Sequence, residues 1–492
     1  MVKPLTIAII GGGFSGTMVA THLLRLANCP LQIKLIEKRA NIGQGLAYST
    51  AVEHHVLNVP AGKMSAFPQE SEHFINWLQN RYSEKAFTAN SFVSRHYYGE
   101  YLQSILQEAH EKARKDVQIE HIHYEATELQ PVDDQVVITC GNGRQITADR
   151  VVLALGNLPP SNPPIADPSF YQSRRYQRWA WSTSLENIVQ PDDAILLIGS
   201  GLTALDLVVN LHYKGHQGKI YMISKRGLVP QAHQQTPAYP FCLKTEQNLN
   251  GLFKHIRQEV KKAEKLGYDW RSVMDALRPH TQDIWKSLTL VEKRRFIRHL
   301  RAYWDNHRHR IASGVSDIIT KLRTSQQLSL YAGEIIAYQE DMDGVTVTVR
   351  PRGSEHTHTI KVQTVINCTG SERLTSQWQY PLLKNIISTG VAQPDALELG
   401  LEVADNGSLV SRTGAKSTTL YTLGPLQKGC LWETTAVQES RQQAEKLATT
   451  LLDSFSLRNT IRPLKSSTIN IESYTVQPMI TPAANFVGVA PY

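Results

Sequence analysis

The amino-acid sequence predicts an α/β fold with two Rossmann-like units, one of which interrupts the other, and a mainly helical insertion. Three observations lead to this fold class. Two glycine-rich turns follow short apolar runs, at residues 6–16 and 194–204. Two more apolar runs end at a glycine, residues 151–156 and 364–370, as crossing strands between two such units would. Alternating strand and helix patterns connect these motifs.

Length and composition agree with a multi-domain globular protein. At 492 residues the chain exceeds one ordinary domain, and its 41% hydrophobic and 20% charged residues exclude a disordered or low-complexity protein. The five cysteines are scattered, and no C-x-x-C pair occurs. We therefore expect a reducing compartment, and the cytoplasm in particular.

The first glycine-rich turn has the form G-x-G-x-x-G. The β-branched run 6–10 leads directly into Gly11, Gly13 and Gly16, and a helix is predicted from 15 to 26. Glycines at these places allow a tight turn, close approach to a pyrophosphate and close packing of the helix on the strand. Glu37 ends the next apolar run, where a carboxylate can accept hydrogen bonds from a ribose. The pattern predicts a dinucleotide site.

The second turn has the form G-x-G-x-x-A. Gly199 and Gly201 follow the run 194–198, and Ala204 occupies the third position. The next strand, 220–223, ends in Ser224-Lys225-Arg226, where an NAD site would carry Asp or Glu. Cations here suit a 2′-phosphate and predict NADP. The alternative, a solvated basic strand end, stays open.

Two such units in one chain are the arrangement of flavoproteins that bind FAD first and a nicotinamide cofactor second. We expect the first part of the FAD-binding domain at 1–160, with a helical insertion at 71–115, and the NAD(P)-binding domain at 161–365, with a basic helical insertion at 245–323. Residues 366–455 would return to the FAD domain, through a strand at 419–424 and a helix at 435–455. A C-terminal tail would occupy 456–492. Strands at 121–129, 135–140 and 145–148 predict a small antiparallel meander, and 344–350 with 357–362 a hairpin.

Further motifs carry a resemblance to a known family. They are Gly43–Tyr48, Leu57–Ala61 with Met64, Asp269–Arg271, Tyr303–Arg310 and Gly424–Glu433. From about residue 5 to 452 the chain resembles the bacterial FAD-NAD(P)-binding protein family, a distant relative of the lysine and ornithine N-hydroxylases and flavin monooxygenases. The resemblance implies FAD and NADP (as NADPH) as cofactors. Pro425 stands where many relatives carry an Asp, so that ribityl contact is not transferred. The F-x-G-x-x-x-H fingerprint of Baeyer–Villiger enzymes is missing, which disfavours that subclass.

The motifs and the resemblance together give the expected cofactor contacts. Those near FAD, or at the crossings and the return segment, are Gly11, Gly13, Phe14, Ser15, Gly16, Glu37, Lys38, Asn58, Met64, Gly156, Gly370, Gly424 and Glu433. Those near the nicotinamide cofactor are Gly199, Ser200, Gly201, Thr203, Ser224, Lys225 and Arg226.

Few side chains suggest chemistry of their own. His233 is the best candidate for a catalytic contact, against the alternative of a structural loop histidine. Arg308 and Arg310 could bind an anionic substrate, against the alternative of a solvated helix face. His356 and His358 share a strand face without a third ligand, so we expect no metal site.

The expected function is an FAD-dependent NADPH oxidoreductase, and by analogy a monooxygenase acting on a small polar or anionic substrate. In that mechanism NADPH reduces FAD, molecular oxygen adds at flavin C4a, and the resulting peroxyflavin meets the substrate. One alternative is a dehydrogenase or reductase that inserts no oxygen. Another is a regulatory protein that binds the nucleotides as ligands. Without a C-x-x-C pair, disulfide reduction is disfavoured.

The charge distribution bears on partners. Residues 251–310 hold 15 Lys/Arg and 7 Asp/Glu, a surplus equal to the net charge of +8 for the whole chain. Without a recognised nucleic-acid module, this single basic segment predicts no nucleic-acid binding. The uncharged run 6–24 contains four glycines and is no membrane span. The tail could plug the cleft, dock on a partner or pack on its own domain, and the oligomeric state stays open.

Overall fold

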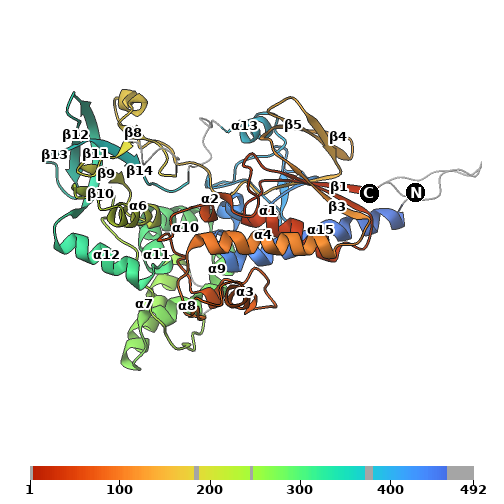
Figure 1. Ribbon diagram of the computed structural model, residues 1–492, viewed down its shortest axis with the longest axis horizontal. Coiled ribbons are helices and arrows are strands. Elements are labelled where there is room, and N and C mark those ends of the chain that lie inside the picture. Colours follow the sequence, from red (N-terminus) through yellow and green to blue (C-terminus); the bar gives the residue numbers. More distant parts are fainter. Residues whose placement is uncertain (1–3, 182–187, 244–247, 372–379, 462–492) are drawn as a thin grey trace, which may run out of the picture. The chain divides into compact units, whose positions relative to one another are not determined.

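The first glycine turn belongs to a six-stranded sheet with the order β15–β16–β7–β1–β2–β3 (Figure 1). Its strands are β1 (Leu5–Ile10), β2 (Leu31–Ile36), β3 (Val117–Ile122), β7 (Arg150–Leu153), β15 (Ser408–Val410) and β16 (Lys416–Thr422). All neighbours are parallel except β15 and β16. The central strands β1 and β7 are apolar and buried because helices cover parallel sheets on both faces. The return strand predicted at 419–424 is confirmed as β16, which pairs in parallel with β7.

The second glycine turn belongs to a seven-stranded sheet with the order β13–β12–β11–β10–β9–β14–β8. Its strands are β8 (Tyr176–Gln177), β9 (Ile195–Ile198), β10 (Ile220–Ser224), β11 (Leu328–Glu340), β12 (Val345–Pro351), β13 (His358–Val362) and β14 (Thr364–Asn367). The strands from β11 to β8 are parallel, and β12 and β13 extend the sheet as an antiparallel hairpin. Two parallel sheets confirm the predicted α/β class with two Rossmann-like units.

A third sheet corrects the predicted meander. It contains β4 (Ala126–Val132), β5 (Gln135–Cys140) and β6 (Gln145–Ala148). The stretch 121–129, predicted as one strand, is split: its first residues end β3, which pairs in parallel with β2. The boundary was missed because the turn between β3 and β4 is only three residues long, His123 to Glu125.

The helices of the first unit include both helices of the predicted insertion at 71–115. They are α1 (Phe14–Leu26), α2 (Gly45–Tyr48), α3 (His73–Arg81), α4 (Arg95–Lys112), α13 (Pro381–Ser388), α14 (Lys428–Leu431) and α15 (Val437–Ile461). α4 packs along α1, which carries the glycine turn at its N-terminus. Aromatic rings of α3 and α4 interlock in this region, with Phe74 and Tyr98 at 4.9 Å between centroids.

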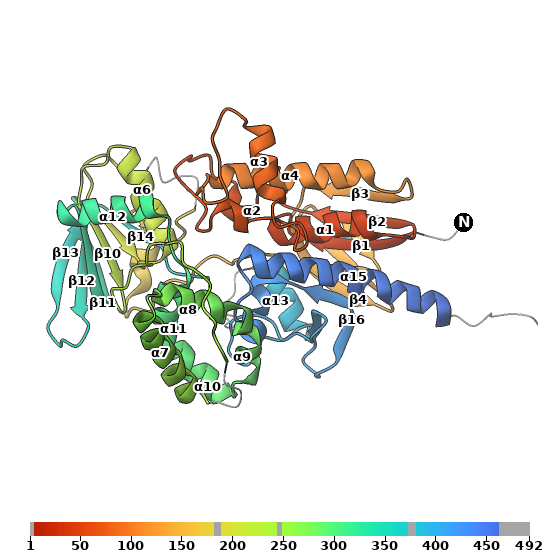
Figure 2. The ribbon, with the colours of Figure 1, turned by 90° about the horizontal axis from the view of Figure 1, so that it is seen from below.

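The basic insertion is helical, as predicted. The second unit contains α6 (Leu202–Tyr213), α7 (Leu249–Lys265), α8 (Trp270–Leu277), α9 (Thr281–Ser287), α10 (Leu290–Arg295), α11 (Arg301–Arg308) and α12 (Ser313–Thr324). Helices α7 to α11 lie together in Figure 2, whereas α12 lies beside α6. A π-helical turn, Phe296–Leu300, joins α10 to α11. Trp285 of α9 donates a hydrogen bond from its indole nitrogen to the Gly429 carbonyl at 2.8 Å, which anchors the insertion on α14.

The computed structural model describes residues 4–181, 188–243, 248–371 and 380–461. By compactness the chain divides differently: residues 1–452, which include both Rossmann-like units, form one body, and residues 453–492 form another. The expectations for the tail fall on residues 456–492, most of which lie outside the described part. No helix among the described residues is long and apolar enough to cross a membrane. The described side chains contain no cluster of three or more potential metal ligands.

Candidate nucleotide sites

The first glycine turn has the backbone that its sequence requires. Gly11 has φ +107°, and a Cβ atom there would lie 2.3 Å from the Ala154 carbonyl oxygen of the crossing strand. A Cβ at Gly16 would lie 1.9 Å from the Gly11 carbonyl oxygen. Gly13 caps α1 without a side-chain hydrogen bond, so the first amides of this helix point out of the turn. Such an N-terminus is suited to a phosphate.

Glu37 follows β2 at the same edge of the sheet. Its carboxylate accepts hydrogen bonds from the backbone amides of Gly12 at 2.7 Å and Arg39 at 2.9 Å. These two bonds orient the carboxylate beside the glycine turn, where a ribose would lie. Lys38 points elsewhere: its ammonium donates to Glu125 at 2.8 Å and lies 5.3 Å from the Tyr380 ring centroid.

The return segment closes over the first turn. A Cβ atom at Gly424 (φ +76°) would lie 3.1 Å from the Ser15 hydroxyl oxygen. The Gly424 amide donates to the side-chain oxygen of Gln443 at 3.1 Å. The buried Gln443 nitrogen and the Thr434 hydroxyl have no hydrogen-bond partner in the described part of the chain. Buried polar groups are nearly always paired, so the unpartnered Gln443 nitrogen and Thr434 hydroxyl fit a polar ligand beside the first turn.

Aromatic and apolar residues complete this cradle. Phe14 stacks on Tyr98 at 6.3 Å, and the buried Tyr98 hydroxyl has no partner among the described residues. Met64 is buried after the short turn Ala61–Lys63, and Asn58 is half-buried in the same loop. A flat apolar ring system with polar edges, as in FAD, fits these surroundings.

The second turn repeats the backbone of the first. Gly199 has φ +113°, and a Cβ there would lie 2.9 Å from the Cys368 carbonyl oxygen of β14. Gly201 caps α6 without a side-chain hydrogen bond, and a Cβ at Gly201 would meet no atom within 4 Å. Thr203, in the first turn of α6, is half-buried. This helix N-terminus is therefore accessible to a second nucleotide.

The end of β10 lies beside this turn. The Ser200 hydroxyl donates to Ser224 at 2.8 Å and also contacts the Leu228 carbonyl, so both serines shape the turn. Lys225 is exposed. Arg226 donates to the Tyr303 hydroxyl at 3.4 Å. Lys225 and Arg226 thus follow β10 beside the second glycine turn.

Both crossing glycines are located at strand ends. Gly156, after β7, has φ +69°, and a Cβ there would meet no atom within 4 Å. Gly370, after β14, would place a Cβ 3.9 Å from the guanidinium of Arg301. Neither position is crowded, so both leave backbone accessible where the chain passes between the units.

A buried ion pair fastens the two units to each other. Arg95 of α4 donates to both oxygens of Asp206 on α6, at 2.8 and 3.0 Å, and to the Val56 carbonyl at 3.0 Å. The His55 ring contacts the Asp206 carbonyl at 3.2 Å. No sequence signal pointed to this pair, because its members lie 111 positions apart and in no motif.

His233 lies where the two units face each other. Its ring meets the ring of Phe92 edge-on at 5.4 Å, and its amide donates to the Ile311 carbonyl at 2.7 Å. Burial, together with the neighbouring cations Arg310 and Lys63, lowers the pKa of His233 to about 4. The ring is therefore neutral near pH 7 and can accept a hydrogen bond.

The two predicted substrate arginines have different surroundings. Arg310 is 7% exposed and pairs with Asp275, but its second terminal nitrogen has no hydrogen-bond partner among the described residues. Arg308 lies 3.6 Å from both Glu433 and Glu439. Arg308, assigned to the substrate, and Glu433, assigned to the cofactor, thus form an ion pair that joins α11 to the return segment.

The residue before Glu433 has a strained backbone that side-chain contacts stabilise. Trp432 has φ +63° and ψ −67°, and the Glu433 amide donates to the Leu431 carbonyl at 2.8 Å, which is a γ-turn. A residue with this conformation is strained by about 1–3 kcal/mol. The Trp432 ring packs against Trp285 at 4.8 Å and Phe296 at 5.0 Å, and these contacts offset the strain. Trp304 donates to Glu433 at 3.0 Å.

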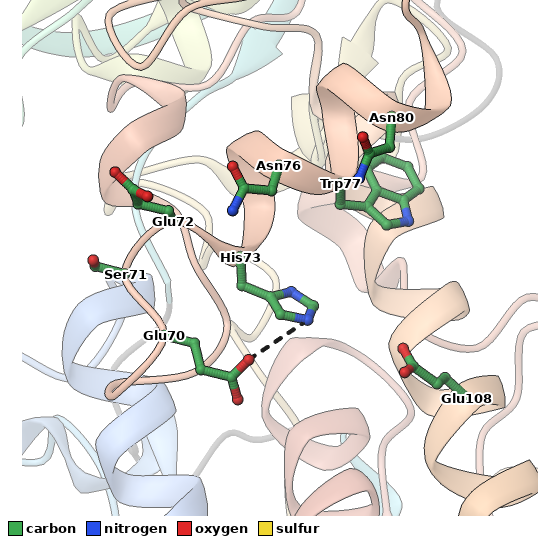
Figure 3. A pocket seen from close by; sticks show the side chains of 8 residues that line it. All are labelled: Glu70, Ser71, Glu72, His73, Asn76, Trp77, Asn80 and Glu108. Carbon is green, nitrogen blue, oxygen red and sulfur yellow. Dashed lines mark ion pairs between the residues drawn. The ribbon is translucent and has the colours of Figure 1, made fainter.

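Two surface cavities lie apart from the glycine turns. One, of about 470 Å³, opens beside α3 and is lined by Glu70, Ser71, Glu72, His73, Asn76, Trp77, Asn80 and Glu108 (Figure 3). In it, His73 lies 3.9 Å from Glu70. The other, of about 400 Å³, is lined by residues of α9, α10 and the segments 395–405 and 427–431, among them Lys286, Lys293, Asp395 and Cys430. Neither contains a residue that the sequence assigned to a site.

Comparison with known proteins agrees with this geometry. Residues 8–158 match the model of the FAD-NAD(P)-binding family. Uncharacterized proteins of Mycobacterium tuberculosis and Mycobacterium bovis are 25% identical over 346 residues, which is 64% of this chain and 63% of the relatives. The chain thus matches less than two thirds of the length of these relatives.

Solved structures share the fold at low identity. The ornithine N-hydroxylase of Kutzneria sp. 744, determined with reduced FAD, NADP+ and L-ornithine, has a TM-score of 0.63 and 14% identity, covering 92% of this chain and 100% of that one. L-lysine 6-monooxygenase of Pseudomonas syringae has a TM-score of 0.62 and 16% identity, with 92% and 100% coverage. The bacillithiol disulfide reductase of Staphylococcus aureus has 0.54 and 13%, with 92% and 99% coverage. Residues 8–158 thus match the FAD-NAD(P)-binding family, and the chain as a whole shares the fold of these solved structures.

Proposed function

We propose that this protein is an FAD-dependent NADPH oxidoreductase that hydroxylates a small anionic substrate with molecular oxygen. The observation that carries the proposal is the pair of glycine turns at the carboxyl edges of two parallel sheets, with His233, Lys63 and Arg310 grouped where the units face each other. When bound, FAD would accept hydride from the nicotinamide and supply reduced flavin for reaction with oxygen.

The residues of the chain would bind and orient the reactants. The amides at the start of α1 would hold the FAD pyrophosphate, with Glu37 on its ribose and Ser15, Thr434 and Gln443 around the rest of the molecule. The start of α6 would hold the pyrophosphate of NADPH, and Lys225 with Arg226 would favour NADPH over NADH.

The substrate would lie against His233. The unpaired nitrogen of buried Arg310 and the exposed ammonium of Lys63 favour an anionic group, such as a carboxylate. The neutral His233 ring could accept a hydrogen bond from the nucleophile that is hydroxylated and so orient it toward the flavin. Phe92 would exclude water from one face of that ring.

Reduction and oxygen use are tested on the purified holoprotein. Bound FAD is identified after heat release. Anaerobic mixing should show faster flavin reduction by NADPH than by NADH, and Lys225→Ala with Arg226→Ala should remove most of that difference. With oxygen, a panel of small amines and carboxylates is screened for product and for hydrogen peroxide. Stoichiometric product with little peroxide supports hydroxylation. Reduction without product under every condition supports a reductase, and absence of reduction supports a regulatory nucleotide-binding protein.

His233 and Arg310 have separate tests. His233→Gln should lower substrate-dependent turnover about 100-fold while leaving anaerobic flavin reduction nearly unchanged. His356→Gln, at an exposed loop position of the same unit, is the control. Arg310→Lys keeps the charge opposite Asp275 but removes the forked donor, and should raise KM about tenfold with a smaller change in kcat. Equal KM values in wild type and Arg310→Lys would contradict the assigned anion contact.

A further inference from the structure

We propose that Arg352 and Tyr303 join Arg226 in a clamp for the 2′-phosphate of NADPH. Neither residue belongs to a glycine motif: Arg352 follows β12 and Tyr303 lies on α11. The clamp rests on the proposed function, because it assumes that a nicotinamide nucleotide binds at the start of α6. It extends that function by naming residues from two distant segments that would decide between NADPH and NADH.

Sheet register brings Arg352 to the end of β10. Ser224, the last residue of β10, lies opposite Ala332 of β11. The Arg352 amide donates to the Ala332 carbonyl at 2.9 Å. A Cβ at Gly227 would lie 3.0 Å from the Ala332 Cβ, so the turn after β10 lies directly over the same residue. Arg352 therefore leaves the sheet beside Lys225 and Arg226, although 126 positions separate it from Arg226 in the sequence.

Tyr303 lies beside the guanidinium groups of both Arg226 and Arg352. The Arg226 guanidinium lies 5.0 Å from the centroid of the Tyr303 ring and donates to the Tyr303 hydroxyl at 3.4 Å. A second Arg226 nitrogen donates to the Arg298 carbonyl at 3.4 Å. Arg352 and then Arg226 lower the pKa of Tyr303, so both guanidinium groups face its hydroxyl. Stacking on the ring restricts Arg226 to this position.

The described part of the chain places no opposite charge on this cluster. No carboxylate of the described residues lies within ion-pair distance of Lys225, Arg226 or Arg352. Arg350, two positions before Arg352, differs because it donates to Glu334 at 3.1 Å. Two guanidinium groups and a phenol around one point suit a phosphate that carries close to two negative charges. Their position after β10 matches the 2′-position of an adenosine ribose bound at the second glycine turn.

The test measures binding, so that it does not depend on catalysis. Isothermal titration calorimetry on the FAD-loaded protein compares 2′,5′-ADP with ADP, which lacks the 2′-phosphate. Arg352→Ala should weaken binding of 2′,5′-ADP about tenfold and leave ADP within about twofold. Tyr303→Phe keeps the ring beneath Arg226 but removes the hydroxyl, and should weaken binding of 2′,5′-ADP about threefold. Arg350→Ala is the matched control and should bind both ligands as wild type does.

The outcomes separate the clamp from the proposed function. An unchanged ratio of the two affinities in Arg352→Ala, in a variant that melts at the wild-type temperature, overturns the clamp. An equal loss in Arg350→Ala also overturns it, because a general positive field would then explain the preference. If inorganic phosphate binds as tightly as 2′,5′-ADP, the site is one for free phosphate. Flavin reduction by NADH in the same preparation would leave the oxidoreductase standing, whereas failure of both nicotinamides to reduce it would remove that function.

Discussion

The two glycine turns share a backbone but differ in their surroundings. Gly11 and Gly199 have φ values of +107° and +113°, and each lies against the carbonyl of a crossing strand. The first turn is then enclosed: a Cβ at Gly13 would lie 3.5 Å from Gly45, and Gly424 approaches Ser15. At the second turn, a Cβ at Gly201 would meet nothing within 4 Å.

This difference indicates different lifetimes for the two ligands. An enclosed site with unpaired buried donors favours a cofactor that stays bound, because release would require the return segment to move. An open helix N-terminus allows a nucleotide to enter and leave in each turnover. The same motif can therefore serve a resident cofactor in one unit and a substrate in the other, and packing around the turn decides which.

The largest expected effect comes from the packing of the first turn. Gly16→Ala would place a methyl group 1.9 Å from the Gly11 carbonyl oxygen, so we expect a loss of about 3 kcal/mol or more in the free energy of unfolding and loss of bound FAD. Urea unfolding and flavin absorbance measure both. The matched change in the second unit, Ala204→Gly, should lower the free energy of unfolding by about 1 kcal/mol. Equal effects of the two variants would contradict the comparison.

The ion pair between the units should have the next largest effect. Arg95→Ala leaves Asp206 buried without its partner and should lower the free energy of unfolding by about 2–4 kcal/mol. Arg114→Ala removes an exposed pair with Asp116 and should change it by less than about 0.5 kcal/mol. Urea unfolding compares the two variants. If the units are held by other contacts, Arg95→Ala will resemble Arg114→Ala.

Acid should weaken the first unit through His22 on α1. Burial lowers the pKa of His22 to about 4 from 6.5, and this histidine is 4% exposed. A lowered histidine pKa contributes stability above pH 6.5 that is lost as the pH falls toward 4. Between pH 7 and 4 the loss should be about 2–3 kcal/mol. His22→Gln should flatten this part of the pH profile of urea unfolding, whereas the exposed His299→Gln should leave it unchanged.

The smallest effect on stability is expected at Gly201. Gly201 has φ −85° and open space around it, which suit an alanine. The free energy of unfolding of Gly201→Ala should therefore change by less than about 0.5 kcal/mol. Binding should still suffer, because a methyl group at this position hinders the approach of a pyrophosphate to the backbone. The Kd for NADP+, which contains the pyrophosphate, should rise severalfold when measured by calorimetry, while FAD content stays at the wild-type value. Loss of FAD in this variant would contradict the separation of the two sites.

Local sequence was enough for the elements that use local rules. The apolar runs before Gly11 and Gly199 predicted β1 and β9, and spacing predicted the helices after them, because strand, turn and helix are adjacent in the chain. Prediction was wrong where a short turn separates two strands, as between β3 and β4. The ion pair between Arg308 and Glu433 could not be predicted either, because 125 positions separate the two residues.

The sequence by itself determined the α/β class, the two nucleotide turns and the basic end of β10, because each depends on residues that are neighbours in the chain. Only the tertiary structure decided that the first turn is enclosed and the second open, that Arg95 meets Asp206, and that Arg352 and Tyr303 lie beside Arg226. Those contacts join segments more than 70 positions apart. Their formation depends on sheet order and helix packing, which no local pattern encodes.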